Sequence, residues 1–178
     1  MKNYSHFGFN DFVICCGYKG YLIKEYFLNY FLYNSDITVE LKNNKVDVYF
    51  ANTESFKVTL VDTGILTNTA GRIKKIEKYV SGETFMLTYG DGVSDINIQE
   101  LVAFHQSHGK LATLTSIRLP TRFGTIETDS SSVIKNFKEK PNDNDIWINA
   151  GYFVLEPGIF KYLENDMEEV QWEKTPMQ

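Results

Sequence analysis

Short apolar runs alternate with amphipathic segments along most of this sequence, and that alternation limits the chain to one class of fold. Runs such as 11–16, 84–88 and 147–155 have the length and composition of buried strands. The segments between such runs place apolar residues three and four positions apart, as amphipathic helices do. Strands that alternate with helices predict a mostly parallel sheet with helices on both faces. The sequence therefore predicts one α/β domain over residues 1–178.

Periodicity and turn residues locate the individual elements. Asn43 and Asn44 lie between two short strand-like runs and predict a hairpin turn there. Helices are expected at 20–33, 72–80, 95–108 and 157–163. Strands are expected at 11–16, 37–41, 46–50, 57–61, 84–88, 112–117, 123–127, 133–138 and 147–155.

Composition and charge argue against several classes of protein. A formal net charge of -5 argues against a general nucleic-acid binder, which would show a basic face. No apolar run reaches the length of a membrane span, and the first residues lack the apolar core of a secretory signal. A cytoplasmic protein is therefore expected. Cys15 and Cys16 are adjacent on a strand and point to opposite faces, so we expect two reduced, buried thiols.

The run Leu-Thr-Tyr-Gly-Asp-Gly at 87–92 is the clearest candidate for chemistry. Asp91 follows a buried strand, and Gly90 and Gly92 on either side allow a sharp turn and a close approach to a ligand. Ligands of open α/β sheets bind beyond the carboxyl ends of the strands. A carboxylate there suits Mg²⁺ that is shared with substrate phosphates. The alternative interpretation is an ordinary turn, because Gly-Asp-Gly is common turn chemistry.

Three other stretches have residues suited to a phosphorylated ligand. The loop 63–72 leads into a helix beside Arg72, so backbone N–H groups and a guanidinium could meet a phosphate chain there; a capped connector is the alternative. Glu139 and Lys140 follow a strand and could bind hydroxyls and a phosphate, although such pairs more often lie in solvated loops. Asn149 interrupts the last long apolar strand, which indicates either a ligand contact or a bulge.

Other catalytic classes lack their sequence patterns. His105 and His108 share a helix, but no third ligand has a zinc-site spacing, so we interpret them as helix-face residues. The sequence contains no Gly-x-Ser-x-Gly elbow, so nothing in it indicates a serine hydrolase. A dinucleotide-dependent oxidoreductase needs Gly-x-Gly-x-x-Gly after the first strand, and the spacing of Gly17 and Gly20 does not provide it.

Five blocks, in the same order along the chain, resemble the sugar-1-phosphate nucleotidyltransferases. The blocks are CCGYKG at 15–20, TLVDTG at 59–64, YGDGV at 89–93, FKEKP at 137–141 and INAGYF at 148–153. The first three are most similar to the glucose-1-phosphate cytidylyltransferase branch of that family. The resemblance implies a Rossmann-like nucleotidyltransferase fold with a mostly parallel, mixed sheet.

The same resemblance implies a reaction and a set of site residues. CMP would pass from CTP to glucose 1-phosphate, giving CDP-glucose and pyrophosphate, with Mg²⁺ on the phosphates. By this resemblance, Asp91 would bind the metal. The nucleotide would contact Thr67, Arg72 and Gly90, and the sugar phosphate would contact Glu139, Lys140 and Asn149. Products of this family feed the dideoxysugars of bacterial surface polysaccharides.

The sequence departs from the family pattern at both ends. The family opens with a strand and a glycine-rich phosphate loop that are not present here, and residues 172–174 resemble a segment upstream of a second metal-binding aspartate. Because that first strand is central in the fold, we expect free strand edges, a homo-oligomer and no measurable cytidylyltransferase activity for the 178-residue chain. The alternative is a non-catalytic remnant that binds a nucleotide or pairs with a full-length enzyme.

Overall fold

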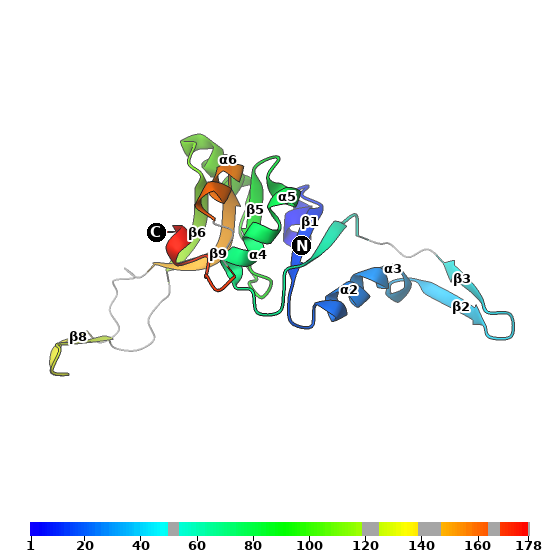
Figure 1. Ribbon diagram of the computed structural model, residues 1–178, viewed down its shortest axis with the longest axis horizontal. Coiled ribbons are helices and arrows are strands. Elements are labelled where there is room, and N and C mark those ends of the chain that lie inside the picture. The colour runs from blue at the N-terminus through cyan, green and yellow to red at the C-terminus, as the bar shows by residue number, and fades with distance from the viewer. Residues whose placement is uncertain (50–53, 119–124, 139–146, 164–167, 178) are drawn as a thin grey trace.

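The computed structural model describes residues 1–49, 54–118, 125–138, 147–163 and 168–177 (Figure 1). Its helices are α1 (Lys2–His6), α2 (Gly20–Leu28), α3 (Tyr30–Tyr33), α4 (Thr69–Lys75), α5 (Glu77–Val80) and α6 (Ile98–His108), with 3-10 helices η1 (Pro157–Tyr162) and η2 (Thr175–Met177). Its strands are β1 (Asp11–Cys16), β2 (Asp36–Glu40), β3 (Lys45–Tyr49), β4 (Lys57–Asp62), β5 (Phe85–Thr88), β6 (Ala112–Arg118), β7 (Thr125–Thr128), β8 (Ile134–Lys138) and β9 (Trp147–Leu155). Within these ranges, no helix has the length and hydropathy needed to cross a bilayer.

Two sheets form the body of the protein (Figure 1). Strands β1 and β4 pair in parallel, from Asp11 opposite Lys57 to Cys16 opposite Asp62. Strand β9 lies between β5 and β6 and runs antiparallel to both. No backbone ladder joins β1 to β5 among the residues that the structure describes. The α/β class is thus confirmed, and β9 makes the sheet more mixed than the alternation of strands and helices predicts.

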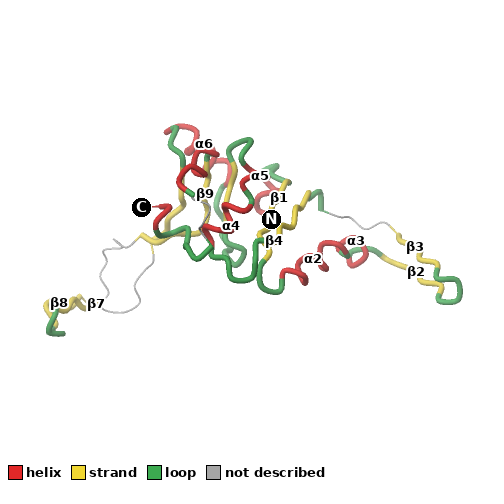
Figure 2. Tube along the Cα trace, viewed as in Figure 1, coloured by secondary structure: helices red, strands yellow, loops and turns green. Residues whose placement is uncertain are grey.

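Two hairpins project from the body at opposite ends (Figure 2). One is β2 with β3 and the other is β7 with β8, and both are antiparallel. The turn of the first hairpin contains Asn44 in the left-handed conformation, with φ at 50°, which asparagine adopts more readily than most residues. The hairpin predicted around Asn43 and Asn44 is therefore confirmed.

Strand β9 is the centre of the hydrophobic core. Its last five residues are buried, and successive side chains point to opposite faces of the sheet. On one face, Phe153 packs with Trp172 and with residues of α4 and η1. On the other face, Tyr152 packs with Tyr4 of α1 and Ile98 of α6. Burial of each large side chain contributes about 2 to 3 kcal/mol, so this strand holds both layers of helices in place.

Two of the predicted helices are divided. The helix expected at 20–33 is interrupted at Asn29, whose side-chain amide donates to the carbonyl oxygen of Glu25 at 2.9 Å. A side chain that bonds the backbone in this way competes with regular helical hydrogen bonds. The next helix begins three residues earlier than expected, at Thr69, and is divided at Ile76, which is buried.

Helix α6 begins later than the predicted residue 95 because a capping residue sets its start. The side-chain oxygen of Asn97 accepts the backbone N–H of Glu100 at 3.1 Å, and its amide donates to the Glu100 carboxylate at 2.9 Å. The first of these bonds satisfies one helix N–H group that otherwise lacks a partner, the second joins the two side chains, and loss of such a cap costs about 1 kcal/mol. The helix then ends at Gly109, whose φ of 61° is the left-handed conformation of a C-terminal cap.

A buried histidine fastens α6 to the sheet. His105 is 1% exposed, and its Nε2 lies 3.0 Å from a carboxylate oxygen of Glu156, which can only accept. With Nε2 as the donor, Nδ1 of the neutral ring accepts the hydroxyl proton of Thr113 at 2.8 Å. The Thr113 oxygen accepts in turn from Nε2 of His108 at 2.7 Å, and Nδ1 of His108 accepts the N–H of Lys110 at 3.0 Å. Every donor in this series of hydrogen bonds therefore has one acceptor.

The Glu156 carboxylate, at the end of this series of hydrogen bonds, is held in its charged form. The hydroxyl of Thr84 donates to Glu156 at 2.8 Å, and this bond, followed by the bond from His105, keeps the pKa of Glu156 below its usual range. A carboxyl whose pKa is lowered by folding stabilises the fold above its usual pKa. That contribution is lost as the pH falls through the lowered value.

We expect His105→Leu to lower the free energy of unfolding by about 2 kcal/mol, because it leaves the buried Thr113 hydroxyl without its acceptor. The exposed His6 provides the matched control, and His6→Leu should change stability by less than about 0.5 kcal/mol. Urea denaturation measures both effects. The wild-type advantage over His105→Leu should shrink in acid as Glu156 takes up a proton, and equal stabilities at neutral pH would contradict the role of the histidine.

Candidate functional site

The loops after β1, β4 and β5 carry most of the residues that the sequence singles out. Gly17 follows β1, the loop 63–68 follows β4 and leads into α4, and Tyr89 follows β5. Loops at the carboxyl ends of strands form the ligand sites of open α/β sheets. The site is therefore built from these loops upward.

Arg72 is fixed against the backbone that follows β1. Its Nη1 donates to the hydroxyl oxygen of Thr63 at 2.6 Å, and that hydroxyl donates to the carbonyl oxygen of Cys16 at 2.9 Å. Thr63 is fully buried, so its hydroxyl cannot turn to water. A Cβ atom on Gly17 would lie 2.5 Å from both terminal nitrogens of Arg72. The absence of a side chain at Gly17 thus allows the guanidinium to lie at the carboxyl ends of β1 and β4.

Thr67 belongs to the same network through a lysine. The ammonium of Lys75 donates to the hydroxyl of Thr67 and to the carbonyl oxygen of Thr63, both at 3.2 Å, and forms an ion pair with Glu168. Thr67 is 6% exposed. The structure therefore brings the two predicted nucleotide residues of this loop together. Lys75 was not predicted, although its position three residues after Arg72 on one helix is a signal for it.

Asp91 lies in an open turn. The N–H of Gly92 donates to the carbonyl oxygen of Tyr89 at 3.3 Å and closes the turn. A Cβ atom on Gly90 would meet no other atom within 4 Å, and the side chain of Asp91 is exposed. The turn thus presents a carboxylate with free space around it.

The donor set at this turn suits a metal ion that arrives with its own ligands. Among the described residues, no group of three or more histidine, cysteine, aspartate or glutamate side chains could hold an ion. Mg²⁺ commonly takes one or two protein carboxylates and completes its shell with water and substrate phosphates. Asp91 therefore fits magnesium carried on a phosphorylated ligand, and within the described part of the chain it belongs to no group of side chains that could hold an ion without such a ligand.

A chain of hydrogen bonds joins the Asp91 turn to α4 and to β9. The hydroxyl of Tyr89 bonds to one carboxylate oxygen of Glu173, and the hydroxyl of Thr69, in α4, donates to the other at 3.2 Å. The side-chain amide of Asn149, in β9, donates to the Tyr89 hydroxyl at 3.4 Å. Burial, followed by the bond to Glu173, raises the pKa of Tyr89 to about 12, so this phenol stays protonated and can donate. This series of side chains is called the Tyr89 chain below.

Gly151 provides the surface on which the Tyr89 ring lies. Its φ of 75° is a left-handed value, and an added Cβ atom would lie 2.7 Å from Cδ2 of Tyr89. The N–H of Gly151 also donates to the side-chain oxygen of Asn149 at 2.8 Å, which orients that amide. Tyr89 and Glu173 were not predicted as site residues, because they are 84 positions apart and no local pattern links them.

The predicted sugar-phosphate residues are only partly placed. Asn149 is exposed and belongs to the Tyr89 chain. Glu139 and Lys140 lie outside the residues that the structure describes.

The two cysteines lie beside the site, and the prediction of two buried thiols holds for Cys16 but not for Cys15. Both are free thiols, with Cys16 buried and Cys15 half-buried. Burial raises the pKa of Cys15 to about 11, so its thiol is protonated and weakly nucleophilic at neutral pH. Covalent catalysis by either thiol has no support.

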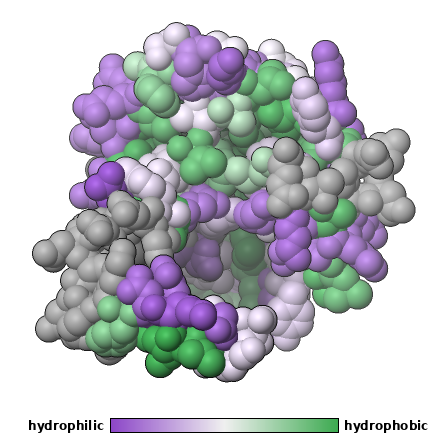
Figure 3. Space-filling model, turned by 90° about the vertical axis from the view of Figure 1, so that its left-hand side faces the viewer, coloured by the Kyte–Doolittle hydropathy of each residue, from purple (hydrophilic) through white to green (hydrophobic). Residues whose placement is uncertain are grey.

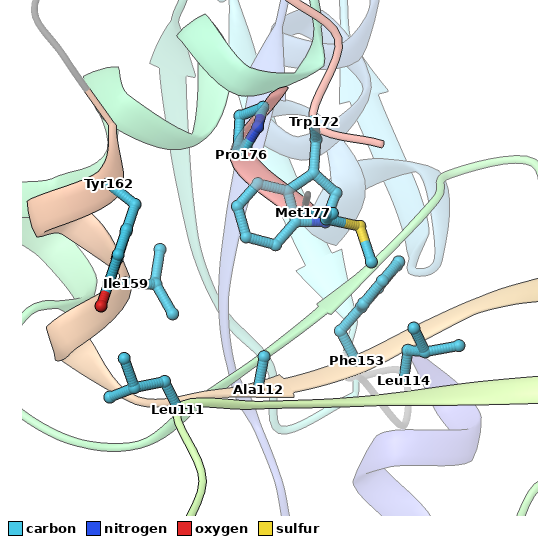
Figure 4. Close-up of a pocket in the computed structure, with 9 residues that line it drawn as sticks. All are labelled: Leu111, Ala112, Leu114, Phe153, Ile159, Tyr162, Trp172, Pro176 and Met177. Atoms are coloured by element: carbon cyan, nitrogen blue, oxygen red, sulfur yellow. The ribbon is translucent and has the colours of Figure 1, made fainter. Parts of the chain in front are cut away.

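A separate cavity of about 420 Å³ lies between the β6–β9 ladder, η1 and the C-terminal segment (Figure 4). Its walls are Leu111, Ala112, Leu114, Phe153, Ile159, Tyr162, Trp172, Pro176 and Met177. None of these described lining residues is charged, so they offer no group that would bind a phosphate. The face in Figure 3 is hollowed where hydrophilic and hydrophobic side chains adjoin. We place the candidate site at the loops around Arg72 and Asp91, which carry charge.

Known proteins resemble this chain over nearly all of its length. The family model described as nucleotidyl transferase matches residues 1–177. Glucose-1-phosphate cytidylyltransferase of Salmonella typhi is 47% identical over 178 residues, which are 99% of this chain and 68% of that protein. UTP–glucose-1-phosphate uridylyltransferase of a Synechocystis strain is 29% identical over 126 residues, which are 64% of this chain and 32% of that protein.

Solved structures of nucleotidyltransferase fold resemble this chain as well. The crystal structure of HddC from Yersinia pseudotuberculosis superposes with a TM-score of 0.61 at 17% sequence identity, over 98% of this chain and 67% of that chain. At this identity the likeness shows the fold alone. The family match and the 47% identity to the Salmonella protein show the family as well as the fold, and they confirm the resemblance found in the five sequence blocks. The chain belongs to the nucleotidyl transferase family.

Proposed function

We propose that the site serves the transfer of CMP from CTP to glucose 1-phosphate. A phosphate oxygen of the sugar attacks the α-phosphorus of CTP, the bond from that phosphorus to the β-phosphate oxygen breaks, and pyrophosphate leaves with the electron pair. The name of the Salmonella relative supports this choice of substrates. CDP-glucose, the product, would supply dideoxysugars for bacterial surface polysaccharides, as the sequence resemblance implies.

The Tyr89 chain is the observation that carries this proposal. It joins α4, which contains Arg72, to the turn of Asp91 and to Asn149. These three segments are the ones for which the sequence resemblance implies nucleotide, metal and sugar contacts. A displacement between two bound substrates depends on holding both in one geometry, and side chains fixed to one another supply that geometry.

Positive charge at the loop after β4 suits the phosphates of the nucleotide. The guanidinium of Arg72 is held in one orientation by Thr63, and its planar fork can bind two phosphate oxygens at once. Lys75 adds an ammonium, although Glu168 already neutralises part of its charge. Fixed charges of this kind stabilise the charge that develops on the phosphates in the transition state.

Asp91 would hold magnesium on the nucleotide phosphates. When bound there, the ion supplies further neutralisation of their charge. The exposed carboxylate and the open backbone of Gly90 leave room for a triphosphate beside it. Gly90 is then the point at which the nucleotide approaches the main chain.

Thermal unfolding in the presence of nucleotides tests this function. A ligand that binds only the folded chain adds about 2.7 kcal/mol of stability at a hundredfold excess over its Kd. With Mg²⁺ present, CTP should raise the unfolding temperature more than UTP or GTP at the same concentration. Equal shifts for the three nucleotides, or none, would contradict the proposal.

A second candidate function is binding without catalysis. It is favoured by one observation, that Asp91 has no partner carboxylates in a metal-binding group among the described residues. Both candidates predict a thermal shift with CTP, so the discriminating measurement is pyrophosphate release from CTP and glucose 1-phosphate with Mg²⁺. Release at rates typical of enzymes supports the transferase, excludes the binding remnant and contradicts the expectation from the sequence that the 178-residue chain is inactive.

We expect Thr63→Val to weaken CTP binding about tenfold while leaving the fold intact. The valine has a similar shape but cannot accept from Arg72, and loss of a hydrogen bond to a charged group costs about 1.5 to 3 kcal/mol. Thr63→Ser keeps the hydroxyl and should restore the affinity. Calorimetric titration with CTP and Mg²⁺ measures the series. Equal weakening by valine and serine would show that Thr63 acts through packing alone.

A further inference from the structure

An exposed tryptophan begins β9, where that strand pairs with the end of β6 (Figure 1). Trp147 lies opposite Arg118 in this ladder, and Asn149 lies opposite Ser116. Residues directly opposite one another on paired strands share a face of the sheet, and so do residues two positions apart on one strand. Trp147 and Asn149 therefore lie on the same face, about 7 Å apart along the strand.

This face of the sheet also carries the Tyr89 chain. Leu114 lies opposite Phe153 and is two residues before Ser116, so Phe153 shares the face of Asn149 despite the irregular register between the two pairs. The Tyr89 ring packs edge-on against Phe153, with the ring centroids 5.9 Å apart, and its hydroxyl accepts from the amide of Asn149 at 3.4 Å. The amide of Asn149 therefore has a phenol on one side and the tryptophan further out along its own strand.

Arg118 holds the indole ring of Trp147 in place. The central guanidinium carbon of Arg118 lies over that ring, 4.4 Å from its centroid, which is the geometry of a cation–π contact. Trp147 nevertheless remains 56% exposed. A large ring that is already held in one orientation loses little conformational entropy when a ligand covers it. The pair thus offers an open aromatic surface next to a positive charge.

A hexose 1-phosphate has the chemistry that matches this arrangement. A pyranose ring with equatorial hydroxyls has an apolar C–H face, which packs on an aromatic ring, while the hydroxyls at its rim bond to a few placed polar side chains. The amide of Asn149 is such a group, because the N–H of Gly151 orients it. The guanidinium of Arg118 suits the phosphate. The nucleotide contacts implied by the sequence lie elsewhere, on the loops after β4 and β5.

We propose that Trp147, held by Arg118, is the surface on which the hexose of the sugar 1-phosphate stacks. This inference rests on the proposed function and deepens it, since it assigns the sugar to one face of the β6–β9 ladder. The stacked ring brings its hydroxyls to Asn149, and the ring plane then fixes the direction from which the sugar phosphate meets the nucleotide. Trp147 is thus a binding residue for the sugar that no local sequence pattern singled out.

Calorimetric titration with glucose 1-phosphate tests the stacking surface with three variants. Trp147→Ala should raise the dissociation constant at least about tenfold, because the hexose loses its apolar cover. Trp147→Phe keeps an aromatic ring and should recover most of the affinity. Phe104→Ala provides the matched control: it removes an aromatic side chain that is 62% exposed on α6, and it should leave the affinity unchanged.

Titration of the same variants with CTP and Mg²⁺ separates the sugar from the nucleotide. Trp147→Ala should bind CTP as wild type does, and a tenfold loss there would place the nucleobase on the ring and overturn the inference. Binding of glucose 1-phosphate to wild type that Trp147→Ala leaves unchanged would overturn the inference alone. If wild type did not bind glucose 1-phosphate at all, the proposed function would fail together with it.

Tryptophan fluorescence of the wild-type chain keeps the inference testable if Trp147→Ala fails to fold. The chain has two tryptophans, and Trp172 is only 3% exposed, so quenching by acrylamide reports mainly on Trp147. Glucose 1-phosphate should reduce this quenching, because the stacked hexose covers the indole. Unchanged quenching at a concentration that saturates the calorimetric signal would place the sugar away from Trp147 and refute the stacking surface.

Discussion

Asp91→Asn should remove the dependence of CTP binding on Mg²⁺. The asparagine keeps the shape of the side chain but loses the charge that holds a hard cation. In wild type, Mg²⁺ should tighten CTP binding at least about tenfold, which corresponds to about 1.4 kcal/mol. In the variant, affinities with and without the ion should be the same. Calorimetric titration with CTP, in the presence and absence of Mg²⁺, measures the difference directly.

Asp95 provides the matched control for this prediction. It is also exposed, lies four residues further along, and forms no ion pair with any other described residue. Asp95→Asn should keep the full effect of Mg²⁺. If Asp91→Asn kept it too, the metal would be held by another group and the assignment of Asp91 would be wrong.

Gly151→Ala is the second change from which we expect a large effect. An alanine would be strained at a φ of 75°, and its methyl group would overlap the Tyr89 ring at 2.7 Å. Strain of the backbone costs about 1 to 2 kcal/mol and overpacking about 1 to 3 kcal/mol. The variant should therefore lose about 2 to 5 kcal/mol of stability. Because Tyr89 precedes the Asp91 turn, its displacement should also weaken nucleotide binding.

Gly82→Ala separates this effect from a general response to losing a glycine. An added Cβ atom on Gly82 meets nothing within 4 Å, and Gly82 has no left-handed φ, so its replacement should be close to neutral. Urea denaturation and CTP titration of the two variants provide the comparison. Similar stabilities for Gly151→Ala and Gly82→Ala would show that the Tyr89 ring yields without cost.

Local sequence patterns predicted the elements whose causes are local. Strand β9 has the bounds expected from its apolar run, and the hairpin turn follows from Asn43 and Asn44. The starts and breaks of helices were less predictable, because single side chains decide them. Asn97 moves the start of α6 by capping it, and Asn29 divides the helix expected at 20–33.

In the candidate site, too, residues with a local sequence pattern were predicted and residues joined only by tertiary contacts were not. Asp91 and Arg72 were proposed because each stands beside glycine where the sequence predicts the end of a strand or the start of a helix, which is a local pattern. Tyr89 and Glu173 were missed because their contact joins residues distant in sequence, and tertiary packing alone brings them together. The buried hydrogen bonds of His105 also depend on a partner from another element, Glu156.

A calorimetric titration of the chain with CDP-glucose and Mg²⁺ tests the central claim most directly, because the proposal requires this one molecule to contact both the nucleotide and the sugar regions of the site. We predict binding at a single site, at least about tenfold tighter than that of UDP-glucose. Glu173→Gln, which alters the carboxylate between Tyr89 and Thr69, should weaken this binding. Absence of binding, or equal affinity for CDP-glucose and UDP-glucose, would contradict the account.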